Sequence, residues 1–164
     1  SNLNSKFGNR LDNITKAVSL LKDKKIKIKK ISNFFESPSY PNKKNPKFIN
    51  IAIEIEYSLS PKKLLKEIFL IERKMERKRN LKNAPRTCDI DIIDFKGKIS
   101  NNKNLTIPHP KAHLRNFVIY PLKDINSNWK HPITNKRIDI LIKKLNFEKR
   151  NEITRMKESV IIDS

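Results

Sequence analysis

The segment of residues 84–95, APRTCDIDIIDF, constrains the fold more than any other part of the sequence. It is rich in β-branched residues and follows a proline, which predicts a strand over residues 88–95. Side chains alternate between the two faces of a strand, so Asp89 and Asp91 should share one face while Ile90 and Ile92 occupy the other. The sequence therefore predicts a strand that presents two neighbouring carboxylates.

The paired carboxylates indicate a nearby cation. Two close carboxylates raise each other's pKa unless a positive charge compensates them. Arg86, three residues before Asp89, could supply that charge, and so could a metal ion. Proteins commonly hold Mg²⁺ through one or two carboxylates together with phosphate oxygens of a substrate. A nucleotide site with Mg²⁺ at Asp89 and Asp91 is the working hypothesis, and an acidic strand face without a ligand is the alternative.

The length of 164 residues fits a single domain with its own core, which we expect to span residues 1–164. No stretch approaches the roughly 20 apolar residues that a membrane-spanning helix needs, and no signal-peptide core follows the N-terminus. The single cysteine, Cys88, cannot form an internal disulfide, and no Cys/His spacing resembles a zinc site. We expect a cytoplasmic, monomeric protein that does not interact with membranes.

The strong positive charge suggests a rival function. There are 37 Lys and Arg against 17 Asp and Glu, a net charge of +20, and clustered basic residues bind nucleic acid. The lysines are spread over nearly every segment, however, and accompany many Asn and Ile, as a general substitution bias would produce. We therefore expect no specific nucleic-acid partner, although a positive field would also attract a polyphosphate.

Helices and strands alternate along the chain without a repeating βα unit. Residues 24–35 are predicted as a strand interrupted near Lys29–Lys30, and residues 48–57 as another strand, with a loop over 37–46 between them. Helices are predicted after Arg10, from an N-cap at Ser60, and over 117–125 and 139–145, the last with Thr134 as a cap. These elements predict an α+β fold in which helices pack on a largely antiparallel sheet.

Phosphate would have to be bound by side chains. Gly8 and Gly97 are the only glycines, which excludes the glycine-rich phosphate loops of P-loop and dinucleotide-binding folds. Basic residues just before the aspartates offer an alternative, since arginine binds phosphate bidentately and lysine acts as a point charge. They are Arg77, Lys78, Arg79, Lys82 and Arg86. For Lys78 and Lys82, a solvated loop is an equally good interpretation.

Four segments together resemble a known enzyme family. They are SNL at the start, ESP with a later F-x-N, APRTCDIDIIDF, and LTIPHPKAHLRNFVIYPL. In this order and separation they are similar to hydroxymethyl-dihydropterin pyrophosphokinases of folate biosynthesis, over residues 1 to about 132. The resemblance implies a ferredoxin-like fold and transfer of pyrophosphate from ATP to a reduced hydroxymethylpterin, releasing AMP. It also implies two Mg²⁺ ions bound by Asp89 and Asp91.

The resemblance assigns further residues by position. Residues expected to bind ATP are Glu72, Arg77, Arg79, Arg86, His109 and Arg115, and the arginines at 77, 79 and 86 match the catalytic mobile-loop arginines. Residues expected to bind pterin are Ser37, Pro38, Phe48, Asn50 and Phe117, with the two phenylalanines sandwiching the ring and Asn50 reading its polar edge. Without the motifs, the aromatics would be interpreted as core residues. His113 and His131 are expected at the surface.

The sequence departs from the family pattern in three places. Members begin with an apolar strand and a glycine before the Ser-Asn pair, whereas this sequence begins at Ser1, so we expect the natural N-terminus to lie upstream. The mobile loop of the family often carries a tryptophan where Asn83-Ala84 stand here. Residues 136–164 fall largely outside the resemblance, and their role is not predicted.

Overall fold

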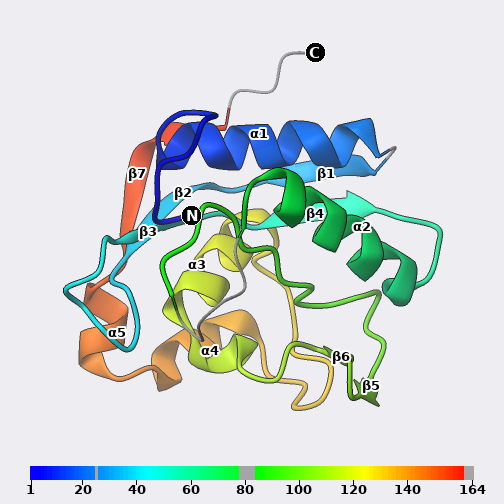
Figure 1. The fold of residues 1–164 in the computed structure, drawn as a ribbon. Coiled ribbons are helices and arrows are strands. Elements are labelled where there is room, and N and C mark those ends of the chain that lie inside the picture. Colours follow the sequence, from blue (N-terminus) through cyan, green and yellow to red (C-terminus); the bar gives the residue numbers. More distant parts are fainter. Residues whose placement is uncertain (25, 78–83, 161–164) are drawn as a thin grey trace.

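The computed structural model describes residues 1–24, 26–77 and 84–160, and its fold is α+β (Figure 1). Helices α1 (Arg10–Asp23) and α2 (Pro61–Lys74) lie on one side of the antiparallel strands. Helices α3 (Asn116–Ile125) and α4 (Ile138–Lys144) lie on the other side, and α3 contacts β2. The α+β class of the prediction is therefore confirmed, with strands between two helical layers.

The strands before α2 form one long hairpin that is broken in the middle. β1 (Lys27–Ile31) pairs antiparallel with β4 (Ile53–Glu56), and β2 (Asn33–Ser37) pairs antiparallel with β3 (Phe48–Asn50). The predicted strands over 24–35 and 48–57 are therefore each split in two.

Ser32 explains the break. Its N–H donates to Ala52 O at 2.9 Å, and its hydroxyl accepts the Ala52 N–H at 2.9 Å. A side chain thus replaces one backbone partner in the ladder. The predicted interruption near Lys29–Lys30 corresponds to a register shift between Ile28 and Lys30.

The segment over 88–95 was expected to be a strand, and in that respect the expectation is wrong. In the described part of the chain it pairs with no strand. Its backbone instead makes isolated contacts: Ile90 N–H donates to Glu72 Oε1 at 2.9 Å, and His109 N–H donates to Ile93 O at 2.9 Å. Periodicity reports which face a side chain occupies, but a ladder also needs a neighbouring strand.

Two helix starts follow from local capping. Asn9 caps α1 with a capping box to Asp12, and Ser60 caps α2 by accepting the Lys63 N–H with Pro61 at the first position. The expected cap at Thr134 is wrong, since α4 begins after Arg137.

Residues after 95 add smaller elements. A turn at Gly97 (φ 68°) leads into the hairpin β5 (Ser100–Asn102) and β6 (Leu105–Ile107). The 3₁₀ turn η1 (Ala112–Leu114) precedes α3. The C-terminal part carries α5 (Phe147–Asn151) and β7 (Thr154–Ser159), which pairs antiparallel with β2. The region with no predicted role therefore contributes an edge strand to the fold.

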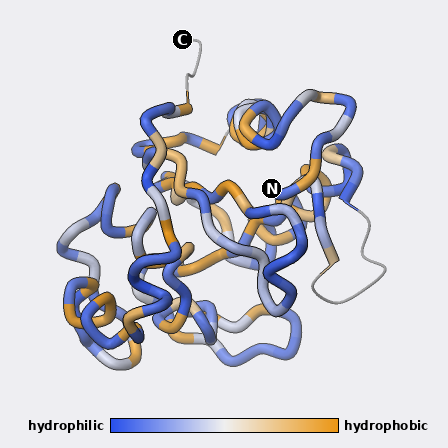
Figure 2. The backbone as a smooth tube through the Cα atoms, turned by 90° about the vertical axis from the view of Figure 1, so that its left-hand side faces the viewer, coloured by the Kyte–Doolittle hydropathy of each residue, from blue (hydrophilic) through white to orange (hydrophobic). Residues whose placement is uncertain are grey.

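Hydrophobic residues are concentrated in the inner segments of the chain, and hydrophilic residues predominate in the peripheral loops (Figure 2). The largest cluster joins α1, α2 and the segment over 88–95, with Ile71 and Met75 at 0 % exposure. A second cluster joins α3 and α4 around Ile119 and Trp129. None of the helices in the described ranges is long and apolar enough to cross a membrane. The aspartate segment is thus fixed through its apolar face.

Candidate active site

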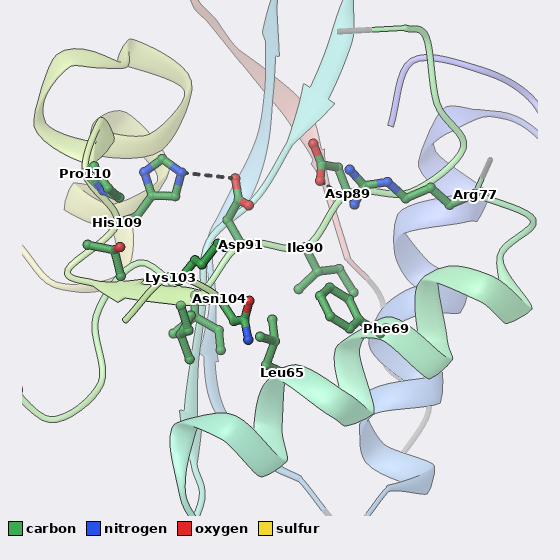
Figure 3. A pocket seen from close by; sticks show the side chains of 13 residues that line it. Leu65, Phe69, Arg77, Asp89, Ile90, Asp91, Lys103, Asn104, His109 and Pro110 are labelled. Atoms are coloured by element: carbon green, nitrogen blue, oxygen red, sulfur yellow. Dashed lines mark ion pairs between the residues drawn. The ribbon is translucent and has the colours of Figure 1, made fainter. Parts of the chain in front are cut away.

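Asp89 and Asp91 extend from the same side of their segment (Figure 3). Cys88 and Ile92, which alternate with them, are only 5 % and 8 % exposed, whereas both aspartates reach solvent. The predicted alternation is therefore confirmed even though the segment is not a paired strand. Burial raises the pKa of the Cys88 thiol to about 12, so Cys88 is an uncharged core residue.

A cavity of about 260 Å³ lies beside the two aspartates (Figure 3). The residues that line it come from α2, the aspartate segment, the β5–β6 hairpin and the loop after β6. They are Leu65, Phe69, Arg77, Asp89, Ile90, Asp91, Ile92, Lys103, Asn104, Leu105, Thr106, His109 and Pro110. Carboxylates, cationic groups and an apolar wall thus meet in one concave site, as in many small-molecule sites.

Asp89 is compensated by two arginines. Arg77 Nη1 lies 2.6 Å from Asp89 Oδ1, and Arg86 Nη1 donates to Asp89 Oδ2 at 2.8 Å. Both guanidinium groups are mostly buried, at 12 % and 20 % exposure. The geometry gathers two groups suited to phosphate at one carboxylate.

Glu72, on α2, contacts both Arg77 and the backbone of the aspartate segment. Its side chain is 2 % exposed, forms an ion pair with Arg77 and accepts the Ile90 N–H at 2.9 Å. A buried carboxylate on α2 therefore fixes both an arginine of the site and the backbone between the two aspartates. A nucleotide contact by Glu72 stays a prediction.

Asp91 has weaker compensation than Asp89. Arg115 Nη1 lies 3.9 Å from Asp91 Oδ2. His109 Nε2 lies 4.0 Å from the same oxygen (Figure 3). Desolvation by the surrounding protein, followed by the negative charge of Asp89, raises the pKa of Asp91 above its usual value. The pair therefore carries negative charge that its protein neighbours only partly balance.

His109 faces this carboxylate with a defined tautomer. Its Nδ1 accepts the Lys111 N–H at 3.1 Å, so the neutral ring carries its proton on Nε2, toward Asp91. Desolvation lowers the pKa of His109 below its usual value, which favours that neutral form near pH 7.

Each aspartate is also linked to one aromatic residue predicted to bind pterin. The Arg86 guanidinium carbon lies 5.5 Å from the ring centroid of Phe48, and that of Arg115 lies 5.5 Å from the ring centroid of Phe117. Arg86 is therefore shared between Asp89 and Phe48, and Arg115 lies between Phe117 and the vicinity of Asp91.

Two of the remaining residues predicted to bind pterin, Ser37 and Asn50, form a small polar group. Asn50 Nδ2 donates to Ser37 Oγ at 3.0 Å and to Phe35 O at 3.3 Å across the β2–β3 pair. Pro38 follows Ser37 at the end of β2. None of Ser37, Pro38, Phe48, Asn50 or Phe117 lines the cavity beside the aspartates. The site therefore has two parts joined by arginines.

The predicted residues and the residues that line the cavity do not fully coincide. Arg79, Lys78 and Lys82 lie outside the described residues. Sequence reasoning missed the cavity wall formed by Phe69, Lys103, Asn104 and Thr106. Its signal was only a polar insert before LTIPHP, which does not indicate where a hairpin turns. No group of three or more His, Cys, Asp or Glu side chains that could hold a metal ion occurs among the described residues.

Comparison with known proteins gives a consistent assignment. Residues 1–127 match the model of the 7,8-dihydro-6-hydroxymethylpterin-pyrophosphokinase family. The chain is 37 % identical over 134 residues to the 2-amino-4-hydroxy-6-hydroxymethyldihydropteridine pyrophosphokinase of Aquifex aeolicus, covering 82 % of this chain and 83 % of that protein. The enzyme of the same name from Bacillus subtilis is 34 % identical over 124 residues, covering 75 % and 74 %.

A longer relative matches over one part of its length. The folic acid synthesis protein fol1 of Pneumocystis carinii is 37 % identical over 143 residues, which cover 87 % of this chain but 19 % of that protein. The chain thus spans about a fifth of that relative. The matched residues 1–127 contain the carboxylate pair, the arginines and both aromatic residues described above, and the chain belongs to the 7,8-dihydro-6-hydroxymethylpterin-pyrophosphokinase family.

Proposed function

We propose that this chain transfers pyrophosphate from ATP to 6-hydroxymethyl-7,8-dihydropterin, giving the pterin diphosphate and AMP. The observation that carries the proposal is the placement of Asp89 and Asp91 beside a cavity whose rim carries Arg77 and His109. Membership in the family supports this reaction. We assign ATP to the cavity beside the aspartates and pterin to the region of Phe48 and Phe117.

The phosphates of ATP would lie at the aspartate cavity. Arg77 and Arg86 both lie at Asp89, so an arriving polyphosphate would meet two guanidinium groups there. Both would exchange the Asp89 carboxylate for phosphate oxygens when Asp89 binds Mg²⁺. Arg115 and the Nε2 proton of His109 face the same space from the Asp91 side. We also propose that Arg79 and Glu72 contact the nucleotide. In phosphoryl transfer such groups act by positioning and by stabilising charge.

The carboxylate pair suits Mg²⁺. Its two oxygen-donor side chains share one face. The cationic groups nearest Asp91 lie 3.9 Å and 4.0 Å from its Oδ2, which leaves this carboxylate without a close cationic partner. Mg²⁺ needs only one or two carboxylates when substrate phosphates and water complete its coordination. We propose two ions held by Asp89 and Asp91. Bound there, Mg²⁺ would neutralise charge on the transferring phosphate groups.

The pterin would lie between Phe48 and Phe117. A flat heterocycle is recognised by aromatic stacking together with a few polar groups. The Asn50 amide, ordered by Ser37, would read the polar edge, with backbone contacts at Ser37 and Pro38. The arginines that touch these rings also approach the aspartates, so the hydroxymethyl group would lie near the phosphates. We further propose a ferredoxin-like topology, a monomer and a cytoplasmic location.

The test is AMP formation from ATP and Mg²⁺, with and without the reduced hydroxymethylpterin. Pterin-dependent AMP would support the proposal. If a folded sample releases no AMP and instead binds DNA or RNA with an affinity that falls steeply with salt, the rival nucleic-acid function is favoured. The variants Asp89→Ala and Asp91→Ala separate the two functions, because only pyrophosphoryl transfer depends on them.

A further inference from the structure

The C-terminal residues 146–152 lie beside both segments that carry the proposed pterin contacts. They fall outside residues 1–127 that match the family model. One of these segments is the loop over 38–47, which joins Pro38 to Phe48 and runs beside α5 (Figure 1). The other is the start of α3, which carries Phe117.

The loop over 38–47 is tied to the C-terminal residues by one lysine. Lys43 Nζ lies 3.1 Å from Glu152 Oε2 and also pairs with Glu148. The base of the loop has its own contact, since Ser39 Oγ donates to Pro46 O at 2.6 Å. Lys43 lies near the middle of the loop, so its ion pairs position the part farthest from β2 and β3.

The start of α3 is tied to the same residues by Asn116. This side chain is 4 % exposed, and its Nδ2 donates to Lys149 O at 2.7 Å and to Glu152 Oε1 at 3.5 Å. Its Oδ1 accepts the N–H of Phe117 at 2.7 Å. Asn116 thus connects the C-terminal residues directly to the backbone of a proposed pterin-stacking residue.

Both connections meet in one carboxylate. Oε2 of Glu152 faces Lys43 and Oε1 faces Asn116, and the side chain is 24 % exposed. We propose that Glu152 is a positioning residue that sets the spacing between the loop leading to Phe48 and the helix start that carries Phe117. The inference rests on the proposed function, because it assigns the two aromatics to one pterin site.

The expected effect is local. Lys43 is 55 % exposed, and ion pairs at such exposure contribute little to global stability. Glu152 also contacts neither the aspartates nor the cavity beside them. Loss of its charge should therefore weaken pterin binding while leaving the nucleotide half of the site unchanged.

The variants Glu152→Gln and Lys43→Met test the proposal in steady-state kinetics. Each should raise the KM for pterin about two- to fivefold, with the KM for ATP and the Tm unchanged. The double variant should be no worse than Lys43→Met alone, because the Lys43–Glu152 ion pair that Glu152→Gln removes is already lost in Lys43→Met. The control is Asp139→Asn, which breaks the similarly exposed Lys123–Asp139 pair (2.7 Å) between α3 and α4 and should leave both KM values unchanged.

An unchanged KM for pterin in both variants, or an equal rise for ATP and pterin, would overturn the proposal.

A readout without turnover separates its failure from failure of the proposed function. The N–H groups of Lys44 and Asn45 donate to the side chain and the carbonyl of Asn42 inside the loop. Hydrogen exchange at these amides should be faster in Lys43→Met than in wild type. Unchanged exchange would show that the ion pairs do not position the loop, whatever reaction the enzyme catalyses.

Discussion

Asp89 and Asp91 share one face of an extended segment, but the protein compensates their charges unequally. Asp89 has guanidinium nitrogens at 2.6 Å and 2.8 Å, whereas the nearest cationic groups of Asp91 lie at 3.9 Å and 4.0 Å. The pKa of Asp91 is raised accordingly, by desolvation and by Asp89. Asp89 is thus held in close ion pairs with two arginines, whereas the negative charge of Asp91 is only partly compensated.

This inequality predicts unequal consequences for stability and the same consequence for activity. Asp89→Asn removes partly buried ion pairs and should lower the free energy of unfolding by about 1–2 kcal/mol. Asp91→Asn removes a poorly compensated charge and should change it by less than about 0.5 kcal/mol. Both should lower kcat/KM at least ~100-fold, since both carboxylates serve the proposed Mg²⁺ site.

Urea unfolding and initial rates of AMP formation measure these effects, with Asp139→Asn, whose side chain is 40 % exposed, as the control. A large loss of stability in Asp91→Asn would show that its neighbours compensate it better than their distances indicate. Full activity in either variant would contradict the metal assignment.

The sequence predicted side-chain faces better than strand pairing. A two-residue period places Asp89 and Asp91 together because it follows from local backbone geometry. Whether the segment joins a sheet depends on which strand lies beside it, and that is a tertiary property. The break at Ser32 and Ala52 escaped prediction for the same reason, since a serine hydroxyl enters the ladder from the opposite strand.

The site was predicted as a set of residues but not as a network. The motifs predict that Arg86 and Phe48 both belong to the site. The two residues lie 38 positions apart in the sequence, however, and their contact cannot be predicted from the spacing within either motif. Glu72 illustrates the same limit, because its link to Ile90 requires α2 to pack against the aspartate segment. Local patterns thus indicate which residues matter, whereas contacts between segments decide what each one touches.

Glu72 provides a second prediction. Glu72→Gln keeps an oxygen that can accept the Ile90 N–H but removes the charge that faces Arg77. We expect a loss of about 1–2 kcal/mol in the free energy of unfolding, and about 3 kcal/mol for Glu72→Ala, which leaves Arg77 without this partner in a mostly buried position. Chemical denaturation measures both values. Equal losses in the two variants would contradict a role for the retained oxygen.

The two aromatics provide a third prediction. Phe48→Leu and Phe117→Leu remove a stacking surface and should each raise the KM for pterin about tenfold, since aromatic stacking on a base is worth ~1–3 kcal/mol. The KM for ATP should stay within about twofold. Phe147→Leu is the matched control, because that ring is 75 % exposed on α5. A KM for ATP that rises in parallel would assign these rings to the nucleotide rather than to pterin.

His131 was expected at the surface, and the expectation is wrong. Its side chain is 2 % exposed, and its ring contacts those of His113 and Trp129 with centroid distances of 4.9 Å and 5.8 Å. Its Nδ1 accepts the N–H groups of Ile133 and Thr134. The polar sequence around it gave no sign of burial, which results from packing of the segment between α3 and α4.

Burial, followed by the nearby His113, lowers the pKa of His131 below its usual 6.5, while Asp94 acts in the opposite direction. The folded protein therefore resists protonation of His131, and the stability that this group contributes is present above pH 6.5 and is lost as the pH falls below it.

His131→Asn keeps an acceptor for the two backbone N–H groups but cannot titrate. We expect wild type to be more stable than the variant at pH 7.5, by about 1–3 kcal/mol of ring packing, and this advantage to shrink between pH 6.5 and 5. Urea unfolding of both proteins across this range measures the difference, and a constant difference would contradict a buried, neutral His131.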